Sequence, residues 1–278
     1  MLIGRRSEAP EHLGLFKQPH QASPEYLSRL ARMLAWCGLE RALSDLATAR
    51  LALCSEPEHP PLAAPLASWL AWREFEPYAR MRDATPQAAR TLAETLAGKP
   101  FAGLALADPT VVERRLRWLC GEDARSFELP AFEWEPDRLE EVTDRFCGFL
   151  YRGRRLAWSR AVFLAGCWRD FGAWRQAQAS RPSWFNSDPE FLSRYLAEAC
   201  LAGPAIDGCQ AMATVQAGAC FARFLEHAGA WTAESVRIAL AFCETVHDSL
   251  LQALEPADPA PRLYRSFEAL TDFRVWGD

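Results

Sequence analysis

The residues best suited to bind a metal lie together near the C-terminal end of the chain. Glu244 and His247 are three positions apart, and Cys243 precedes His247 by four. Residues at these spacings are neighbours on a helix, and carboxylate, imidazole and thiolate groups all ligate metals. Di-iron helical bundles need two Glu-x-x-His pairs, and no second pair falls on a predicted helix here. We therefore expect no metal and no cofactor. The alternative hypothesis is an all-helical metal- or cofactor-dependent enzyme with a site around Glu244, His247 and Cys243.

Three carboxylates near residue 140 are a weaker candidate for a Mg²⁺ site. Glu140, Glu141 and Asp144 carry the oxygen ligands that Mg²⁺ prefers. Glu140 and Glu141, however, fall in about the first turn of a predicted helix, where the helix dipole stabilises a negative charge by about 0.3–1 kcal/mol. That role accounts for them without a metal, so we assign no metal ligands to this region.

Arginine and tryptophan are concentrated along residues 152–175. Six arginines stand there against one acidic residue, Asp170: Arg152, Arg154, Arg155, Arg160, Arg169 and Arg175. Such a stretch can bind single-stranded nucleic acid through stacking and charge. The formal net charge of −5 opposes that interpretation, and tryptophans on a helix that is apolar on most faces belong to a core. We therefore do not expect nucleic acid as a partner.

Residues 122–141, called the acidic segment below, contain the strongest functional signal. Eight acidic and two basic residues give the segment a charge of −6, whereas the rest of the chain carries +1. Buried aromatic anchors supply binding energy at protein interfaces, and carboxylates attract a basic partner. The alternative is a solvated loop whose aromatic side chains fold back onto the core. The predicted partner-binding residues are Glu122, Asp123, Phe127, Glu128, Phe132, Glu133, Trp134, Glu135 and Asp137.

These observations favour a binding protein over an enzyme. The sequence has no Gly-x-Gly-x-x-Gly, Walker A, His-Glu-x-x-His or Gly-x-Ser-x-Gly motif. Our leading hypothesis is a non-enzymatic protein-binding module whose partner has a basic surface. One form of it is an immunity protein that sequesters and neutralises a basic, nuclease-type toxin. A chaperone or adaptor for a secreted protein would use the same kind of surface.

The elements that position these residues are predicted to be helices. Apolar residues recur at helical spacing between clear start and stop signals. Side chains that can cap a helix stand before it at Ser23, Thr85, Asp108, Asp188 and Thr232, and glycines that can take the left-handed conformation follow at Gly98, Gly121, Gly203 and Gly229. The predicted helices span residues 24–37, 39–54, 61–76, 86–97, 109–120, 137–150, 154–178, 189–201, 205–228, 233–254 and 262–271.

The predicted fold is all-α, an irregular multi-helix domain of about ten helices. At most a minor β-ribbon is expected, from short alternating stretches at 132–135 and 273–276. We expect a flexible N-terminal segment at 1–22 and one all-helical domain at 23–278, in which 121–137 is a candidate junction between subdomains.

Composition sets the broad class. The 278 residues are 50% hydrophobic and 24% charged, which is typical of a globular protein and excludes a disordered or collagen-like chain. Nine cysteines without a Cys-x-x-Cys pair exclude zinc-finger and thioredoxin-type sites. Without a signal peptide or an apolar run of about 20 residues, we expect a cytoplasmic protein. The dominance of arginine over lysine suggests a bacterial G+C-rich genome, and 11 tryptophans are compatible with a homodimer.

Overall fold

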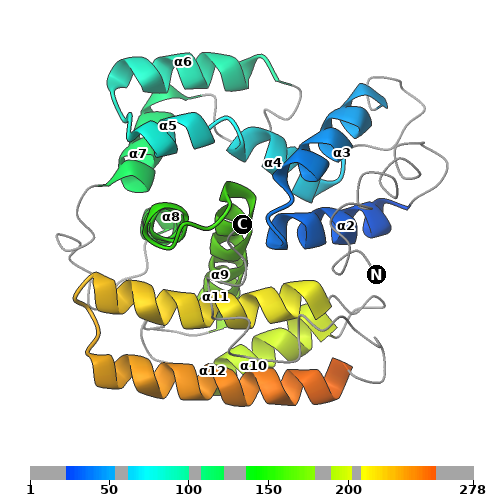
Figure 1. The fold of residues 1–278 in the computed structure, drawn as a ribbon, viewed down its shortest axis with the longest axis vertical. Coiled ribbons are helices and arrows are strands. Elements are labelled where there is room, and N and C mark those ends of the chain that lie inside the picture. Colours follow the sequence, from blue (N-terminus) through cyan, green and yellow to red (C-terminus); the bar gives the residue numbers. More distant parts are fainter. Residues whose placement is uncertain are drawn as a thin grey trace. The chain divides into compact units, whose positions relative to one another are not determined.

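The structure is a computed structural model that describes residues 23–53, 62–99, 108–121, 136–178, 189–201 and 208–254. Within these ranges the regular elements are eleven α-helices and two π-helical turns, and no strand is present (Figure 1). The predicted all-α fold is therefore confirmed. The two stretches considered for a β-ribbon and the helix predicted at 262–271 lie outside the described residues.

The chain divides into two compact units. Unit 1 comprises residues 1–120 and 156–163, and unit 2 comprises residues 121–155 and 164–278. The helix α9 (Trp158–Gln178) begins in unit 1 and ends in unit 2. None of the described helices combines the length and the apolar character that crossing a membrane requires.

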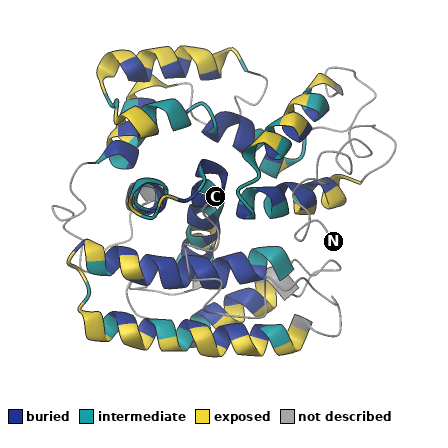
Figure 2. Cartoon of the chain, in the orientation of Figure 1, coloured by how far each residue is buried: buried dark blue, intermediate teal, exposed yellow. Residues whose placement is uncertain are grey.

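Unit 1 is a set of short helices that pack against their neighbours in sequence. Its core contains leucines of every longer helix together with Trp36 and Phe75, which are fully buried (Figure 2). The most extensive packing joins α6 to α7, α3 to α4 and α2 to α3. The helices are α2 (Pro24–Trp36), α3 (Glu40–Leu53), α4 (Ala64–Trp72), α5 (Glu76–Met81), α6 (Pro86–Ala97) and α7 (Pro109–Cys120).

The single helix predicted at 61–76 is wrong. The structure has α4, a turn at 73–75 and a separate helix, α5, that was not predicted. Pro77 lies in the first turn of α5. Because proline has no N–H, it cannot make the hydrogen bond to the carbonyl of Arg73 that a continuous helix requires, so the helix restarts.

The helix predicted at 154–178 begins later, at Trp158. Arg155 has a φ of 56°, in the left-handed region that a right-handed helix cannot include. The first turn of α9 is then fixed inside unit 1. The N–H of Ser159 donates to Glu40 Oε1 at 2.8 Å, and the indole N–H of Trp158 donates to the carbonyl of Trp72 at 2.9 Å.

A glycine turn joins α2 to α3. Gly38 has a φ of +69°, and a Cβ at this position would lie 2.9 Å from the Cβ of Ala157. Both the positive φ and the close approach of Ala157 therefore require glycine at this position.

Four of the five predicted helix caps are confirmed, and Asp188 lies outside the described residues. Each side-chain oxygen accepts a hydrogen bond from a backbone N–H two or three residues later. The pairs are Ser23 with Tyr26 at 3.2 Å, Thr85 with Ala88 at 3.3 Å, Asp108 with Thr110 at 2.8 Å and Thr232 with Ser235 at 3.2 Å.

The predicted glycine stops have mixed outcomes. Gly229 follows α11 with a φ of +72°, so its left-handed conformation is confirmed. Gly98 ends α6 as predicted, but its φ is −77°, so it does not use the left-handed conformation that glycine allows there. Gly121 follows α7 directly, and Gly203 lies outside the described residues.

Unit 2 is organised around one buried helix, α11. Every residue of α11 from Ala211 to Leu225 is buried except Arg223. The ring of Phe221 contacts those of Trp168 on α9 and Phe146 on α8, with centroids 4.7 Å and 5.2 Å away. In addition to the C-terminal part of α9, unit 2 contains α8 (Pro136–Gly148), η2 (Phe149–Gly153), α10 (Pro189–Tyr195), η3 (Leu196–Leu201), α11 (Gly208–His227) and α12 (Ala233–Leu254).

Candidate functional site

The predicted partner-binding residues fall almost entirely beyond the part of the chain that is described. Glu122, Asp123, Phe127, Glu128, Phe132, Glu133, Trp134 and Glu135 lie in the gap between α7 and α8. Asp137 belongs to the first turn of α8, and its side chain is also outside the description. Their role as a binding surface stays a prediction.

The helices on either side of the acidic segment each bury one face. On the unit 1 side, Leu119 is fully buried, and the thiol of Cys120 lies 3.6 Å from the carbonyl oxygen of Tyr78. On the unit 2 side, α8 buries Val142 and Phe146, which are 2% and 0% exposed. The end of α7 is thus packed within unit 1, and α8 is packed within unit 2.

The first turns of α8 carry a ladder of ion pairs. Arg138 Nη1 donates to Glu141 Oε2 at 2.8 Å, and Arg145 Nε donates to Glu141 Oε1 at 3.0 Å. The side chain of Glu141 is only 12% exposed, so these pairs are better shielded from solvent than an ordinary surface ion pair.

These ion pairs involve one of the three carboxylates that could form a Mg²⁺ site, Glu141. Both carboxylate oxygens of Glu141 are engaged by arginine, and among the described residues no group of three or more His, Cys, Asp or Glu side chains is placed to hold a metal ion. For Glu141, the structure shows ion pairs with two arginines of its own helix.

The second set of metal candidates is divided between the two faces of α12. Cys243 and His247 point inward and are 4% and 1% exposed, whereas Glu244 is exposed. Glu244 therefore lies on the exposed face of the helix and the other two residues lie on its buried face. Their spacing in the sequence does not bring the three groups together. The Nδ1 atom of His247 lies 3.2 Å from Asp248 Oδ1.

The thiol of Cys243 is also a poor ligand or nucleophile. Burial, and secondarily the neighbouring Cys220 thiol, raise the pKa of Cys243 to about 12. A thiol must ionise to attack or to bind metal. At neutral pH Cys243 therefore behaves as a small apolar core residue.

The arginine- and tryptophan-rich stretch contributes to the interior. Trp158 and Arg160 are each 1% exposed, and Arg175 is 6% exposed with its guanidinium 5.0 Å from the ring centroid of Phe191. Arg154 lies 5.2 Å from the ring centroid of Phe149. These arginines stack on aromatic rings or are buried, which is the arrangement expected when the tryptophans form a core.

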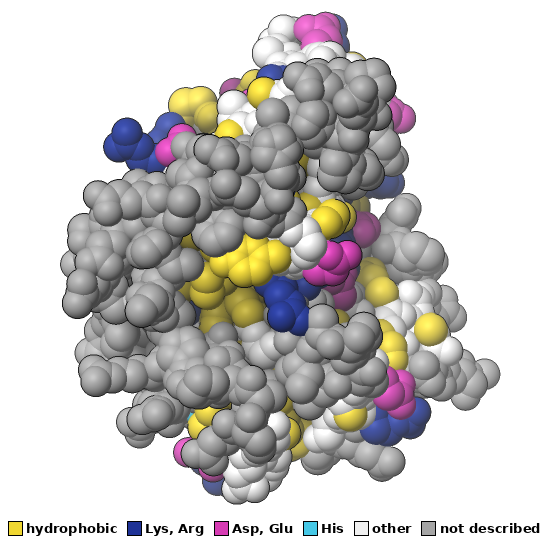
Figure 3. All heavy atoms as spheres, turned by 90° about the vertical axis from the view of Figure 1, so that its right-hand side faces the viewer, with side chains coloured by type: hydrophobic (Ala, Val, Ile, Leu, Met, Phe, Trp, Pro, Cys, Tyr) yellow, Lys and Arg dark blue, Asp and Glu magenta, His cyan; other side chains and the backbone are white. Residues whose placement is uncertain are grey.

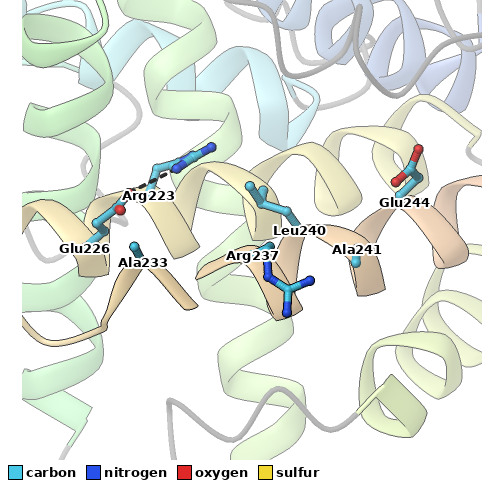
Figure 4. A pocket seen from close by; sticks show the side chains of 7 residues that line it. All are labelled: Arg223, Glu226, Ala233, Arg237, Leu240, Ala241 and Glu244. Carbon is cyan, nitrogen blue, oxygen red and sulfur yellow. Dashed lines mark hydrogen bonds and ion pairs between the residues drawn. The ribbon is translucent and has the colours of Figure 1, made fainter. Parts of the chain in front are cut away.

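An open pocket that the sequence did not predict lies between α11 and α12 (Figure 4). It has a volume of about 320 Å³. The α12 residues follow the helical repeat, but their opposing residues on α11 could not be identified without the packing of the two helices. The lining residues are Arg223, Glu226, Ala233, Arg237, Leu240, Ala241 and Glu244.

Comparisons of the chain with protein-family models, with curated proteins and with solved structures found no match. Its function is therefore inferred from its own residues, their burial and their charges.

Proposed function

We propose that this protein is a protein-binding module without chemistry of its own, and that its acidic segment recognises a basic surface on the partner. The observation that carries the proposal is the charge distribution, because 122–141 holds a charge of −6 and the rest of the chain holds +1. A local excess of one sign steers association with an oppositely charged partner.

The described surface agrees with this localisation of charge. On the face shown in Figure 3, basic and acidic side chains of the described residues are interspersed and do not form a patch of one sign. Elsewhere among the described residues, charged side chains pair within one helix, as Arg117 does with Glu113 and Arg223 with Glu226. Such pairs cancel at the distance of an approaching protein, so they add little to the attraction.

Few basic residues of the acidic segment can neutralise its carboxylates. One of the two, Arg138, donates to Glu141 within α8. That leaves Arg125 as the one other basic residue among the carboxylates of the segment.

The partner class that fits best is a protein that acts on nucleic acid. Such proteins bind phosphates with clusters of lysine and arginine, and an acidic surface with aromatic anchors can occupy the same cluster. We therefore propose an immunity function, in which this chain neutralises a basic, nuclease-type toxin. A chaperone or adaptor would differ in the fate of the partner and not in the surface used.

The test is co-expression with the products of the reading frames adjacent to the gene. One of them should arrest growth when expressed alone, and this chain should restore growth and bind it in surface plasmon resonance. Reversal of Glu133, Glu135 and Asp137 to arginine should lower the association rate about 10- to 100-fold at low salt and weaken its salt dependence.

A matched variant reverses three exposed carboxylates elsewhere, Asp45, Glu94 and Glu198. It should associate within about twofold of the wild-type rate, because these charges lie outside the acidic segment. Equal rates for the two triple variants would reject the acidic segment as the binding surface.

A further inference from the structure

A second surface, separate in sequence from the acidic segment, lies along α12. The α12 residues that line the α11–α12 pocket recur at helical spacing from Ala233 to Glu244, so they form one stripe about 16 Å long. Arg223 and Glu226 of α11 border the same pocket (Figure 4). The feature is therefore a short groove between two packed helices and not a hole at one point.

The floor of this groove is apolar and firmly supported. Leu240 is partly buried and packs against the core cluster of Ala222, Val236 and Ala239. Ala241 is exposed beside it, and a small side chain there leaves the groove open. An incoming apolar side chain would therefore meet apolar surface that is already packed against the core.

Exposed apolar surface continues beyond the groove. Ile238 is 53% exposed and stands three positions before Ala241, so the two side chains are neighbours on the helix. Among the described residues of unit 2, Ile238 is the one large hydrophobic side chain with such exposure.

The charges at the rim are not balanced along the groove. Arg223 donates to Glu226 at 3.1 Å, and Arg237 donates to both carboxylate oxygens of Glu234 at 2.6 Å and 2.9 Å. Each guanidinium is thus matched by a carboxylate. Glu244, at the far end of the stripe, has no hydrogen bond or ion pair with any described residue. The charge left over for a ligand is negative.

We propose that the α11–α12 groove binds a peptide segment of a protein partner in which an apolar side chain lies about one helical turn from a basic side chain. The apolar group packs on Leu240 and Ala241, and the basic group pairs with Glu244. A free anion does not fit, because both arginines are already paired. The pocket volume of about 320 Å³ is at the lower end of the range for small-molecule pockets. It therefore has room for one or two side chains of a peptide and not for a larger segment.

The site uses residues outside the acidic segment, so it goes beyond the proposed function and can be tested separately. The probes are two blocked, alanine-based 12-residue peptides with leucine and arginine, or leucine and glutamate, four positions apart. The full-length ¹⁵N-labelled protein is titrated with each probe. The arginine peptide should shift the amide signals of residues 233–244, and the glutamate peptide should bind at least about tenfold more weakly.

Two substitutions identify the groove as the binding site. Glu244→Gln should weaken binding of the arginine peptide about three- to tenfold, and Ala241→Arg, which fills the groove, should abolish the shifts. Glu94→Gln and Ala97→Arg are matched controls at exposed positions of α6 and should leave binding unchanged. Circular dichroism verifies that each variant is folded.

Several results would overturn the proposal. Equal binding of the two peptides would show that contact is merely hydrophobic, and binding unaffected by Glu244→Gln and Ala241→Arg would place the peptide elsewhere. A dimer in sedimentation that Ala241→Arg dissociates would assign the groove to a second copy of the chain. Charge reversal in the acidic segment should not alter peptide binding, so the two proposals fail independently.

Discussion

The two long helices of unit 2 pack side by side but lie in opposite environments. In α11 the side chains are buried on every face along most of the helix, whereas α12 buries one stripe and exposes the rest (Figure 2). The inward positions of α12 are Val236, Ala239, Cys243, Val246, His247 and Leu250.

The difference indicates that the two helices have separate roles in unit 2. From Gly208 to Ala222, α11 has no charged residue and many small ones, so other helices can approach it closely. The exposed face of α12 carries Glu234, Arg237 and Glu244, which are available to solvent or to a partner. The buried helix stabilises the unit, and the half-exposed helix presents chemistry.

The largest expected effect tests the core role of α11. Phe221 is 2% exposed and contacts the rings of Phe146, Trp168 and Phe224. Phe221→Ala should lower the free energy of unfolding by about 3–5 kcal/mol, because it removes apolar contacts and leaves a cavity. Urea unfolding followed by circular dichroism measures the change.

The matched substitution on α12 is Ile238→Ser, at a position that is 53% exposed. It should change the free energy of unfolding by no more than about 0.5 kcal/mol. Similar losses from the two substitutions would contradict the division between a buried and a presenting helix.

A pH experiment tests the inward face of α12. Burial raises the pKa of Cys243 from 9.0 to about 12. Below pH 9 the thiol is protonated in both the folded and the unfolded chain, so its contribution to stability is fully present. Between pH 9 and pH 12 the unfolded chain releases the proton first, and stability falls by about 1.4 kcal/mol per pH unit.

Cys243→Ala removes this titration while leaving the rest of the chain unchanged. The free energy of unfolding is therefore measured for the wild type and the variant at pH 8 and pH 10.5. The advantage of the wild type should shrink by about 2 kcal/mol between the two pH values. A constant difference would mean that Cys243 ionises as readily in the folded protein as in the unfolded one.

Local signals explain how much of the fold could be predicted. A capping side chain and the periodic apolar residues after it lie within a few residues of each other, and the helices that begin after Ser23, Thr85, Asp108 and Thr232 were predicted with starts within one residue. The errors arose where one residue overrode the pattern, as Pro77 did within 61–76 and Arg155 did within 154–178.

The candidate sites depended on packing that no local pattern contains. The spacing of Glu244 and His247 places them near each other on a helix, but the neighbouring α11 decides which of them is buried. The groove needs Arg223 and Glu226 from α11 as well as residues of α12. The acidic segment was recognisable because charge excess is a property of composition, and its binding role stays a prediction.

A smaller loss of stability than for Phe221 or Cys243 is expected at the start of α12. Thr232 Oγ1 accepts a hydrogen bond from the N–H of Ser235 at 3.2 Å. Thr232→Ala removes this cap and should lower the free energy of unfolding by about 1 kcal/mol. Thr245 is a matched control, since it is an exposed threonine within the same helix whose hydroxyl donates to the carbonyl of Ala241 at 3.0 Å. Thr245→Ala should raise stability by a few tenths of a kcal/mol, roughly the difference in helix propensity. Equal losses from the two substitutions, measured by urea unfolding, would show that a hydroxyl matters on α12 and that its capping position does not.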